Sequence, residues 1–417
     1  MVTTVRTRLA RLPWAGLTLT LGQLALMGTS LIFSLSLAYA GGLAAVGATA
    51  SAVLVFQLTC GVLQRTLAEA TLLASSHADR RADRATCQSS IAAALLGGTA
   101  GTALAALSAL AVPDAPTELA FVYAAGIPFA IALDIGRSAS VAAGAAKPAF
   151  LETAGYLAVQ TLLMLLFAAA HSPMGVCLVW TLTNVLFFLV SAAQPHRRPA
   201  VRGLLSWVRS RRSLMGMASF DALLAGLTPL LALQATAFVT TAGTLGAARI
   251  LQQVFAPLAF VSITLRRVLI YRRRAETVAT RYQEVRDGLL SMSLMAAGAA
   301  LLGVAVLLGQ NTIAALSFIP VGAALVAAGV EKAALGLSFG CSLSKFVRGE
   351  FNALLRARYV MLALAVLLGP LLTVAWGAAG YLLGSAIAMA VYGVIVVALP
   401  GDRALGSATG TLAPTLR

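Results

Sequence analysis

Nine ionisable side chains interrupt the apolar stretches of this 417-residue sequence, and their types and positions suggest chemistry. An ionisable group at the centre of a bilayer costs about 2.5 to 3.5 kcal/mol on insertion scales, so such groups normally face a protein interior or a hydrated cavity. The set therefore predicts polar sites within an otherwise apolar protein. Its members are Arg65, Glu69, Asp134, Arg137, Asp221, Arg249, Arg266, Glu331 and Lys332.

Two couples in this set have the spacing of neighbours on one helix face. Asp134 and Arg137 are three residues apart, and Arg65 and Glu69 are four apart. Residues at these spacings lie close together on a helix, so each couple can neutralise itself. The alternative is that their charges face a cavity and contact a ligand.

The couple Glu331 and Lys332 differs because the two residues are adjacent. Adjacent helical residues point about 100° apart, which favours pairing with other helices or with a substrate. A buried ion pair between helices is the competing interpretation.

Twelve apolar segments must position these groups. Hydrophobic residues make up 59% of the chain and charged residues 11%, whereas about 25% of an ordinary soluble domain is charged. About 20 apolar residues span a bilayer as a helix. We therefore predict an all-α polytopic membrane protein with spans at 14–38, 43–64, 86–112, 119–143, 151–170, 174–193, 214–240, 245–266, 289–308, 313–341, 359–376 and 380–399. The charges in the tenth segment leave eleven crossings as an alternative, and charge bias favours twelve.

Basic residues lie in alternate gaps between these segments. The odd-numbered gaps contain no Lys or Arg. The positive-inside rule then places both termini in the cytoplasm. The net charge of +16 lies mostly on that face, which favours contact with anionic membrane lipids rather than with nucleic acid. The N-terminal tail and the even gaps hold Arg6, Arg8, Arg11, Arg80, Arg81, Arg84, Lys147, the runs 197–212 and 272–286, Lys345, Arg348, Arg356 and Arg358.

The chain also has the features of an internal duplication. Six spans map onto six, which predicts an N-terminal six-helix bundle at 1–196, a basic cytoplasmic linker at 197–213 and a C-terminal six-helix bundle at 214–417. Transporter binding sites commonly lie at the interface between such repeats. A shift of 201 residues superimposes Gly42 on Gly243, Val53 on Val254, Arg65 on Arg266 and Lys147 on Arg348.

Arg249 stands out as a lone charge in the eighth span. It lies about 10 Å below the predicted outer face and is followed by Gln252, Gln253 and a helix-interrupting Pro257. Three interpretations remain open: the side chain lines a transport cavity, pairs with an unidentified acid, or extends to the outer interface. Asp221 lies about 20 Å away in height, so the two cannot pair in straight helices.

Four cysteines, Cys60, Cys87, Cys177 and Cys341, lack metal-type spacing. They indicate neither a disulfide framework nor a metal site, and the sequence indicates no cofactor.

Three stretches resemble a known family. Residues 248–258, ARILQQVFAPL, are similar to the LRAAQTLFGPL pattern of bacterial polysaccharide flippases in the MOP (multidrug, oligosaccharidyl-lipid, polysaccharide) superfamily, with the Arg, a Gln and the Pro in register. Residues 63–70, LQRTLAEA, resemble the family's ARALVGEPLL, although Ala68 and Ala70 replace its Gly and Pro. Residues 126–148 resemble LPLLLLQDLLRY…GRP and keep the spacing of the Asp and the Arg.

This resemblance implies a non-enzymatic transporter of twelve or fourteen helices, in two six-helix bundles around a V-shaped cavity, that works by alternating access. The polysaccharide branch moves undecaprenyl-diphosphate-linked glycans from the inner to the outer leaflet of the bacterial cytoplasmic membrane, where glycan-assembly machinery is an expected partner. Diphosphate-binding or cavity cations would be Arg65, Arg137, Arg249 and Arg266, with Lys332 as a supplementary charge. Candidates for proton or sodium coupling would be Glu69, Asp134, Asp221 and Glu331.

Three other function classes are weighed against this one. A multidrug or cation antiporter of the same superfamily would want acids and aromatic residues with few opposing cations, and the nine groups comprise five basic and four acidic ones. A major facilitator carrier would have a G-x-x-x-D-R-x-G-R-R loop, which residues 78–84 match only in part. A glycan-assembly enzyme would need a sizeable outer loop, whereas the longest predicted one, 113–118, has only Asp114 and Glu118 as acids.

Overall fold

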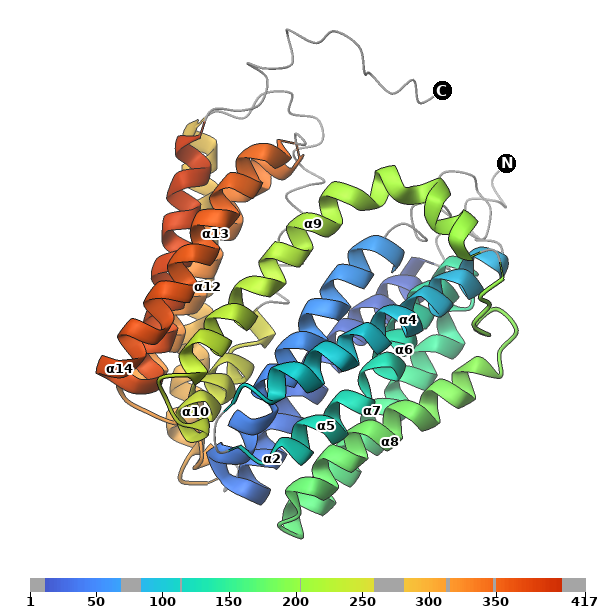
Figure 1. Ribbon diagram of the computed structural model, residues 1–417, viewed down its shortest axis with the longest axis horizontal. Helices are drawn as coiled ribbons and strands as arrows, with labels where there is room; N and C mark the ends of the chain where they lie inside the picture. The colour runs from blue at the N-terminus through green and yellow to red at the C-terminus, as the bar shows by residue number, and fades with distance from the viewer. Residues whose placement is uncertain are drawn as a thin grey trace, which may run out of the picture.

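The computed structural model describes residues 12–68, 84–112, 115–202, 204–258, 281–312, 316–347 and 350–399, and its regular structure in those ranges is helical throughout. Two of the predicted site residues, Glu69 and Arg266, lie outside the described residues. The helices (Figure 1) are α2 (Leu12–Leu63), the π-helix η1 (Gln64–Ala68), α4 (Arg84–Ala109), α5 (Thr117–Ala125), α6 (Ile127–Ala142), α7 (Ala146–Ala169), α8 (Pro173–Ala192), α9 (Leu204–Ala237), α10 (Ala242–Val254), α12 (Arg281–Gly309), α13 (Ala323–Val347) and α14 (Phe351–Ala398).

Nine stretches of helix in the described part of the chain are long and apolar enough to cross a membrane, so the prediction of a multi-pass membrane protein holds. Two of them contain a reversal. The chain turns at Gly42 in α2, with a φ of +72°, and at Gly377 in α14, with a φ of +56°. Glycine adopts such positive φ angles without steric cost, and both turns fall in predicted gaps.

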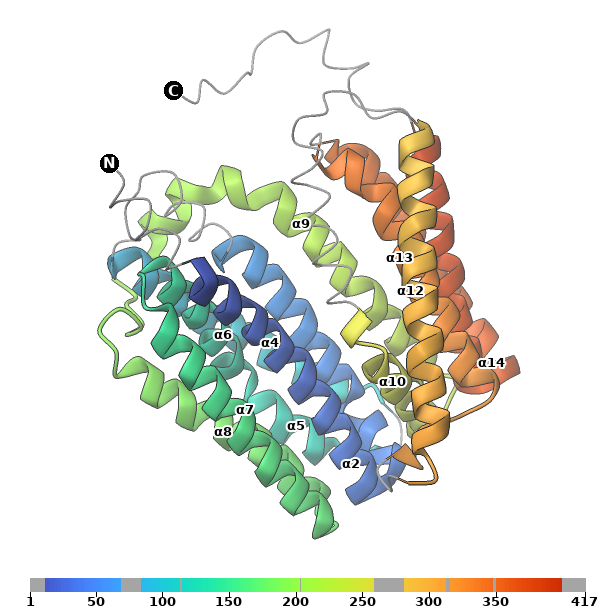
Figure 2. The same ribbon diagram turned by 180° about the vertical axis from the view of Figure 1, so that it is seen from behind.

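The eighth predicted span is described only in part, because α10 ends at Val254 and residues 259–280 lie outside the described ranges. The total of twelve crossings therefore stays a prediction, as does the side of the membrane on which the termini lie. The first turn of α2 and the last turn of α14 do lie toward the same end of the molecule (Figure 2).

Several boundaries differ from those that hydropathy predicted. The fourth span is divided into α5 and α6 at Gly126, just before Pro128, whose ring removes a backbone donor. α9 begins at Leu204, inside the stretch predicted to be a linker. α13 begins at Ala323, later than the predicted start at residue 313. Hydropathy marks where a helix is apolar, not where its hydrogen bonding begins or ends.

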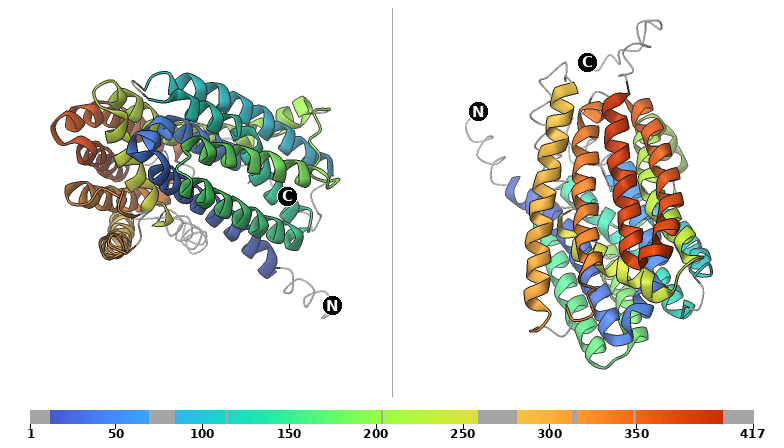
Figure 3. Two further views of the ribbon diagram at one scale, coloured as in Figure 1. Left: turned by 90° about the horizontal axis from the view of Figure 1, so that it is seen from below. Right: turned by 90° about the vertical axis from the view of Figure 1, so that its left-hand side faces the viewer.

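The helices form two groups that α9 and α10 connect. α4 to α8 pack around α2, while α12, α13 and both arms of α14 lie side by side (Figure 3). α10 packs mainly against α2, and α9 packs against both α2 and α14. The pairing of these two groups creates an interface in which side chains from distant parts of the sequence meet.

The outer surface of both groups carries exposed leucines at helical spacing. The side chains of Leu107, Leu162, Leu301 and Leu371 are each more than 60% exposed. An apolar surface of this extent on long helices is suited to lipid rather than to water. The polar groups are correspondingly drawn to the interior and to the interface between the groups.

Candidate functional site

Asp221 joins two arginines from distant elements at the interface between the helix groups. Its carboxylate, on α9, accepts a hydrogen bond from Arg65 of η1 at 3.1 Å and from Arg358 of α14 at 3.3 Å. The Asp221 side chain is only 6% exposed, while those of Arg65 and Arg358 are 26% and 18% exposed. Two partly open guanidinium groups therefore flank one buried carboxylate.

Arg358 was assigned to a cytoplasmic gap by hydropathy. The structure shows that this residue is helical, because α14 begins at Phe351, before the predicted start of the span at residue 359. A regular helical pattern continues back from the apolar segment through Ala353, Leu354 and Ala357, which are all buried. The helical spacing of these three apolar residues is the feature of the sequence that could have predicted the earlier start of the helix.

The π-helix η1 connects this group to a second cluster inside the N-terminal helices. Gln64 donates a hydrogen bond to the Asp134 carboxylate at 2.6 Å, while the next residue, Arg65, reaches Asp221 on the other side. One wide turn of backbone thus serves two polar clusters. π-helical turns occur frequently at functional sites, where the extra residue redirects side chains.

Asp134 and Arg137 form the ion pair that their spacing predicts, with a separation of 3.6 Å. Both residues are 5% exposed, and the Arg137 guanidinium lies 5.3 Å from the centre of the Tyr156 ring. The Tyr156 hydroxyl in turn donates to Asn184 at 3.2 Å. The pair faces other N-terminal helices, so a role of Arg137 in contacting substrate stays a prediction.

A third cluster centres on Glu331 of α13. Its carboxylate accepts hydrogen bonds from Gln252 of α10 at 2.9 Å and from Ser385 of α14 at 3.0 Å. The Lys332 ammonium lies 3.0 Å from the other oxygen of Glu331. Glu331 therefore contacts two other helices, as its position in the sequence favoured, and it also pairs with the adjacent Lys332, which the 100° separation did not predict.

Arg249 continues this cluster toward α2. It donates to Gln57 at 2.8 Å and to Gln252 at 3.2 Å, and its Nε has no hydrogen-bond partner among the described residues. The residue is 4% exposed, so it does not extend to the outer interface. No carboxylate of the described residues lies within ion-pair distance of it. The chain of contacts from Glu331 through Gln252 and Arg249 to Gln57 spans both helix groups.

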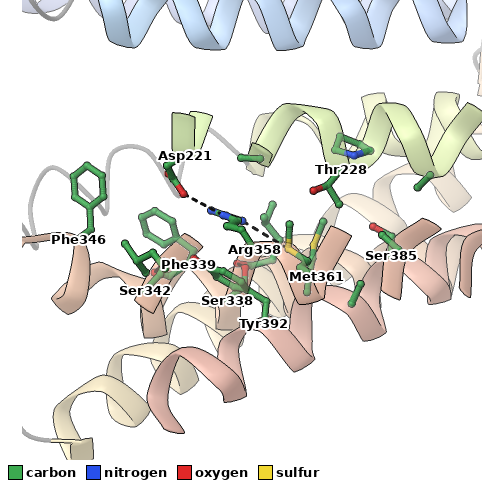
Figure 4. A pocket seen from close by; sticks show the side chains of 18 of the residues that line it. Asp221, Thr228, Ser338, Phe339, Ser342, Phe346, Arg358, Met361, Ser385 and Tyr392 are labelled. Atoms are coloured by element: carbon green, nitrogen blue, oxygen red, sulfur yellow. Dashed lines mark hydrogen bonds and ion pairs between the residues drawn. The ribbon is translucent and has the colours of Figure 1, made fainter. Parts of the chain in front are cut away.

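A pocket of about 320 Å³ lies between α9, α13 and α14 (Figure 4). Arg65, Asp221 and Arg358 line one part of it, and Ser385 and Tyr381 line another part, next to Glu331. Figure 4 shows Arg358 pointing between Asp221 and Met361. Much of the remaining lining is apolar. The pocket therefore combines an end that holds two guanidinium groups and one carboxylate with a mostly apolar remainder.

The two helix groups meet tightly at the end away from this arginine pair. Gly47 of α2 lies against the Ala242 carbonyl, and Gly246 of α10 lies against the Leu43 carbonyl, so closely that a Cβ on either glycine would overlap the oxygen. Beside them, the Tyr39 ring contacts the ring of Phe318 from the α12–α13 connection. This end is therefore closed.

Charge within the three clusters is unbalanced. They contain five cations and three carboxylates among the described residues, which leaves two positive charges without an anionic counterpart. The cations are Arg65, Arg137, Arg249, Lys332 and Arg358, and the carboxylates are Asp134, Asp221 and Glu331. In the same described ranges, no three His, Cys, Asp or Glu side chains gather as a metal site would require.

The segment between α8 and α9 is anchored by a buried arginine that sequence analysis did not single out. Arg197, 1% exposed, donates to Glu152, Ser140 and Ser191, each at 2.5 Å. His196 lies 3.1 Å from the Ser140 hydroxyl. Burial lowers the pKa of the Arg197 guanidinium, and Glu152 opposes that shift. These contacts hold the start of the connection against the N-terminal helices.

No protein-family model and no curated protein sequence matches this chain. The fold is similar to that of the lipid II flippase MurJ in an inward closed conformation, with a TM-score of 0.67 and 10% identity over 92% of this chain and 86% of that one. It is also similar to an inward-facing multidrug resistance MATE family transporter of the MOP superfamily, with a TM-score of 0.60 and 14% identity over 94% and 98%.

A MATE structure in complex with MaD5 has a TM-score of 0.57 and 16% identity over 94% of this chain and 96% of that one. At such identities the likeness concerns the fold. As far as the fold is concerned, it confirms the resemblance to the MOP superfamily that the three sequence stretches suggested.

Proposed function

We propose, from the premise that this chain has the multi-pass transporter fold of the MOP superfamily, that it flips a polyprenyl-diphosphate-linked oligosaccharide across the membrane. Transport would run from the inner to the outer leaflet of a bacterial cytoplasmic membrane, by alternating access, and would serve polysaccharide or cell-surface glycan biosynthesis. The similarity of the fold to that of a lipid II flippase supports a lipid-linked substrate.

The excess of two cations among the described residues of the clusters is the observation that carries this proposal. A buried arginine without a carboxylate costs free energy, so its retention inside an apolar protein calls for an anionic ligand. Arg249 is such a residue, since its described partners are the neutral Gln57 and Gln252. A diphosphate supplies the missing negative charge, and planar guanidinium groups bind its oxygens in pairs.

The closed end supports loading from one side. Gly47 and Gly246 bring α2 and α10 together away from the first turn of α2, while Arg65 and Arg358 lie partly exposed on the other side of that contact. With the predicted orientation, access is from the cytoplasm. A substrate made in the cytoplasmic leaflet would then meet the arginines first, with anionic lipids and glycan-assembly machinery as proposed neighbours.

The carboxylates are proposed to couple transport to a proton or sodium ion. Asp221 and Glu331 each contact residues from more than one helix, so a change in their charge would alter contacts between elements. Asp134 contacts η1 through Gln64 and would act on Arg65 indirectly. The roles proposed for Glu69 and Arg266 rest on sequence alone.

A multidrug or cation antiporter is the second candidate. The specific observation in its favour is Glu331, a carboxylate 1% exposed that receives hydrogen bonds from Gln252 and Ser385. The similarity of the fold to those of two MATE transporters also supports this alternative. The cation excess disfavours it, because Arg249 and Lys332 lie in the same cluster and would repel a cationic drug.

Ligand binding to the full chain in nanodiscs separates the two candidates. We expect saturable binding of undecaprenyl diphosphate and none of ethidium. Arg249→Ala should weaken lipid binding by about ten- to a hundredfold, which corresponds to the loss of one charged hydrogen-bonding partner, and Arg249→Lys should retain part of it.

Arg356→Ala is the matched control, because Arg356 is exposed and belongs to none of the three polar clusters. Binding of ethidium without the lipid would favour the antiporter. Equal lipid affinity in the wild type and Arg249→Ala would reject the role of Arg249.

A further inference from the structure

We infer that the pocket between α9, α13 and α14 binds the diphosphate of a polyprenyl diphosphate together with its first isoprenyl units. Arg358 and Arg65 contact the diphosphate, and the apolar lining contacts the chain. The inference rests on the proposed function and deepens it, because it assigns the first contacts of the diphosphate and the adjoining isoprenyl units to a pocket that Arg249 does not line. Arg358 is the key new residue.

Arg358 is held in one orientation by three neighbours before any ligand arrives. Its Nε donates to Asp221 at 3.3 Å, its Nη1 lies 3.7 Å from the sulfur of Met361, and its Cζ lies 4.3 Å from the centre of the Tyr392 ring. The aromatic face attracts the cation and fixes the guanidinium plane. A pre-oriented cation loses little conformational entropy when it binds an anion.

Both arginines retain hydrogen-bond donors for a ligand. Arg65 uses one N–H group on Asp221, and a guanidinium carries five. Arg358 contacts Asp221 and Met361 through two of its nitrogens and leaves the third without a protein partner in the described part of the chain. Both arginines line the pocket and are more exposed than Asp221, so their remaining N–H groups are accessible to a ligand.

The rest of the lining is mostly apolar, and the hydroxyl-bearing residues Thr228, Ser338, Ser342 and Ser385 also belong to it. Phe339, Leu343, Met361 and Met389 line the pocket next to the arginines. Methionine side chains adapt to flexible apolar ligands. The volume of about 320 Å³ is at the low end for ligand pockets, so it suits the head and the start of the chain, and the rest of a long polyprenyl tail stays in the lipid.

This juxtaposition selects an amphiphilic anion over a free one. A free diphosphate would leave the apolar lining in contact with water, and an uncharged prenyl chain would leave Arg65 and Arg358 without their ligand. A prenyl diphosphate satisfies both surfaces at once. We therefore expect head and chain to contribute separately to its affinity.

The test uses three probes on the full chain in nanodiscs, with empty nanodiscs as the background: farnesyl diphosphate, inorganic pyrophosphate and farnesol. We expect farnesyl diphosphate to bind at least tenfold more tightly than pyrophosphate, and farnesol to show no saturable binding. Equal affinities for farnesyl diphosphate and pyrophosphate would overturn the assignment of the chain, and would mean that the site binds the headgroup alone.

Arg358→Gln tests the head. It should lower the affinity for farnesyl diphosphate at least tenfold, and Arg358→Lys should restore part of it. Arg356→Gln makes the same change in charge on an exposed position of the same helix and should leave binding unchanged. If Arg358→Gln binds farnesyl diphosphate as the wild type does, Arg358 is not a headgroup residue.

Ala225→Phe tests the contact with the isoprenyl units, because Ala225 of α9 lines the pocket and a larger side chain there would fill it. The affinity for farnesyl diphosphate should fall several-fold while that for pyrophosphate stays the same. Leu223→Phe, at an exposed position of α9 outside the pocket, is the control. An unchanged affinity of Ala225→Phe for farnesyl diphosphate would show that the isoprenyl units do not bind in this pocket.

The inference and the proposed function fail in different ways. Flipping of a polyprenyl-diphosphate-linked glycan in proteoliposomes, with no effect of Arg358→Gln on farnesyl diphosphate binding, would keep the function and reject this site. Arg358-dependent binding without flipping would keep the site and reject the function.

Discussion

Asp221 accepts hydrogen bonds from Arg65 of η1 and Arg358 of α14, with nitrogen–oxygen distances of 3.1 and 3.3 Å. One carboxylate of α9 therefore links an element of the N-terminal helices to one of the C-terminal helices. It also occupies the position that an anionic ligand of the two arginines would seek. Asp221 thus stabilises the two arginines, and under the proposed function it would compete with a bound anion.

Replacing Asp221 by Asn should strengthen anion binding and weaken the fold. Without the carboxylate, the two guanidinium groups lose an anionic competitor, and we expect pyrophosphate affinity to rise roughly fivefold, or by about 1 kcal/mol after allowance for solvent screening. The midpoint of thermal unfolding should fall. Calorimetric titration and a thermal melt in detergent measure the two effects.

Asp134→Asn is the matched control for this substitution, because Asp134 is a buried carboxylate that does not line the pocket. It should lower thermal stability without raising anion affinity. If Asp221→Asn leaves pyrophosphate affinity unchanged or lowers it, the competition between the carboxylate and the ligand is refuted.

Gly246→Ala should open the closed end. An added Cβ would overlap the Leu43 carbonyl oxygen, so α10 cannot approach α2 as closely. We expect a shift toward an outward-open state. A cysteine in place of the exposed Gln57 should then react several-fold faster with a membrane-impermeant maleimide applied from outside.

Gly61→Ala provides the control, because no neighbouring atom lies within 4 Å of the position that its Cβ would take. Labelling in this variant should match that of the parent. An unchanged rate in Gly246→Ala would show that the glycine contact does not determine closure.

His196 should make stability depend on pH. Burial, with help from Arg197 and Arg84, lowers the pKa of His196 below its ordinary value of 6.5. The unfolded chain therefore binds a proton more readily than the folded one, and stability should fall as pH decreases from about 6.5 toward the lower folded pKa. Thermal melts between pH 7.5 and 5 should show this fall for the wild type.

His196→Gln should lose this part of the pH dependence, since glutamine does not titrate. His196→Lys is charged at every pH in the range. It should therefore be less stable throughout, and its thermal stability should vary with pH as little as that of His196→Gln. A wild-type slope that persists in His196→Gln would assign the effect to another group.

The predicted orientation can be tested at two exposed positions. Asn311 follows α12 and Ser206 lies in the first turn of α9. With both termini in the cytoplasm, a cysteine at position 311 should react with an impermeant reagent from outside, and one at position 206 only after the membrane is permeabilised. The reverse pattern would invert the topology.

Much of the fold follows from local features of the chain. Apolar segments of bilayer length predicted the helices, and Gly42 and Gly377 fell in predicted gaps because short glycine-containing segments separate long apolar runs. The pairing of Asp134 with Arg137 also followed from spacing. Each of these depends on residues only a few positions apart.

The amino-acid sequence by itself determined the membrane class, the helical architecture and the burial of Asp134, Arg249 and Glu331 within apolar segments, because hydropathy and helical periodicity act over short distances along the chain. Only the tertiary structure decided that Arg65 and Arg358 share Asp221, that Lys332 folds back onto Glu331, and that Arg197 is buried. The physical reason is that such pairings depend on how each helix is rotated and packed against its neighbours. Hydrophobic periodicity defines the buried face of a helix but not its partner.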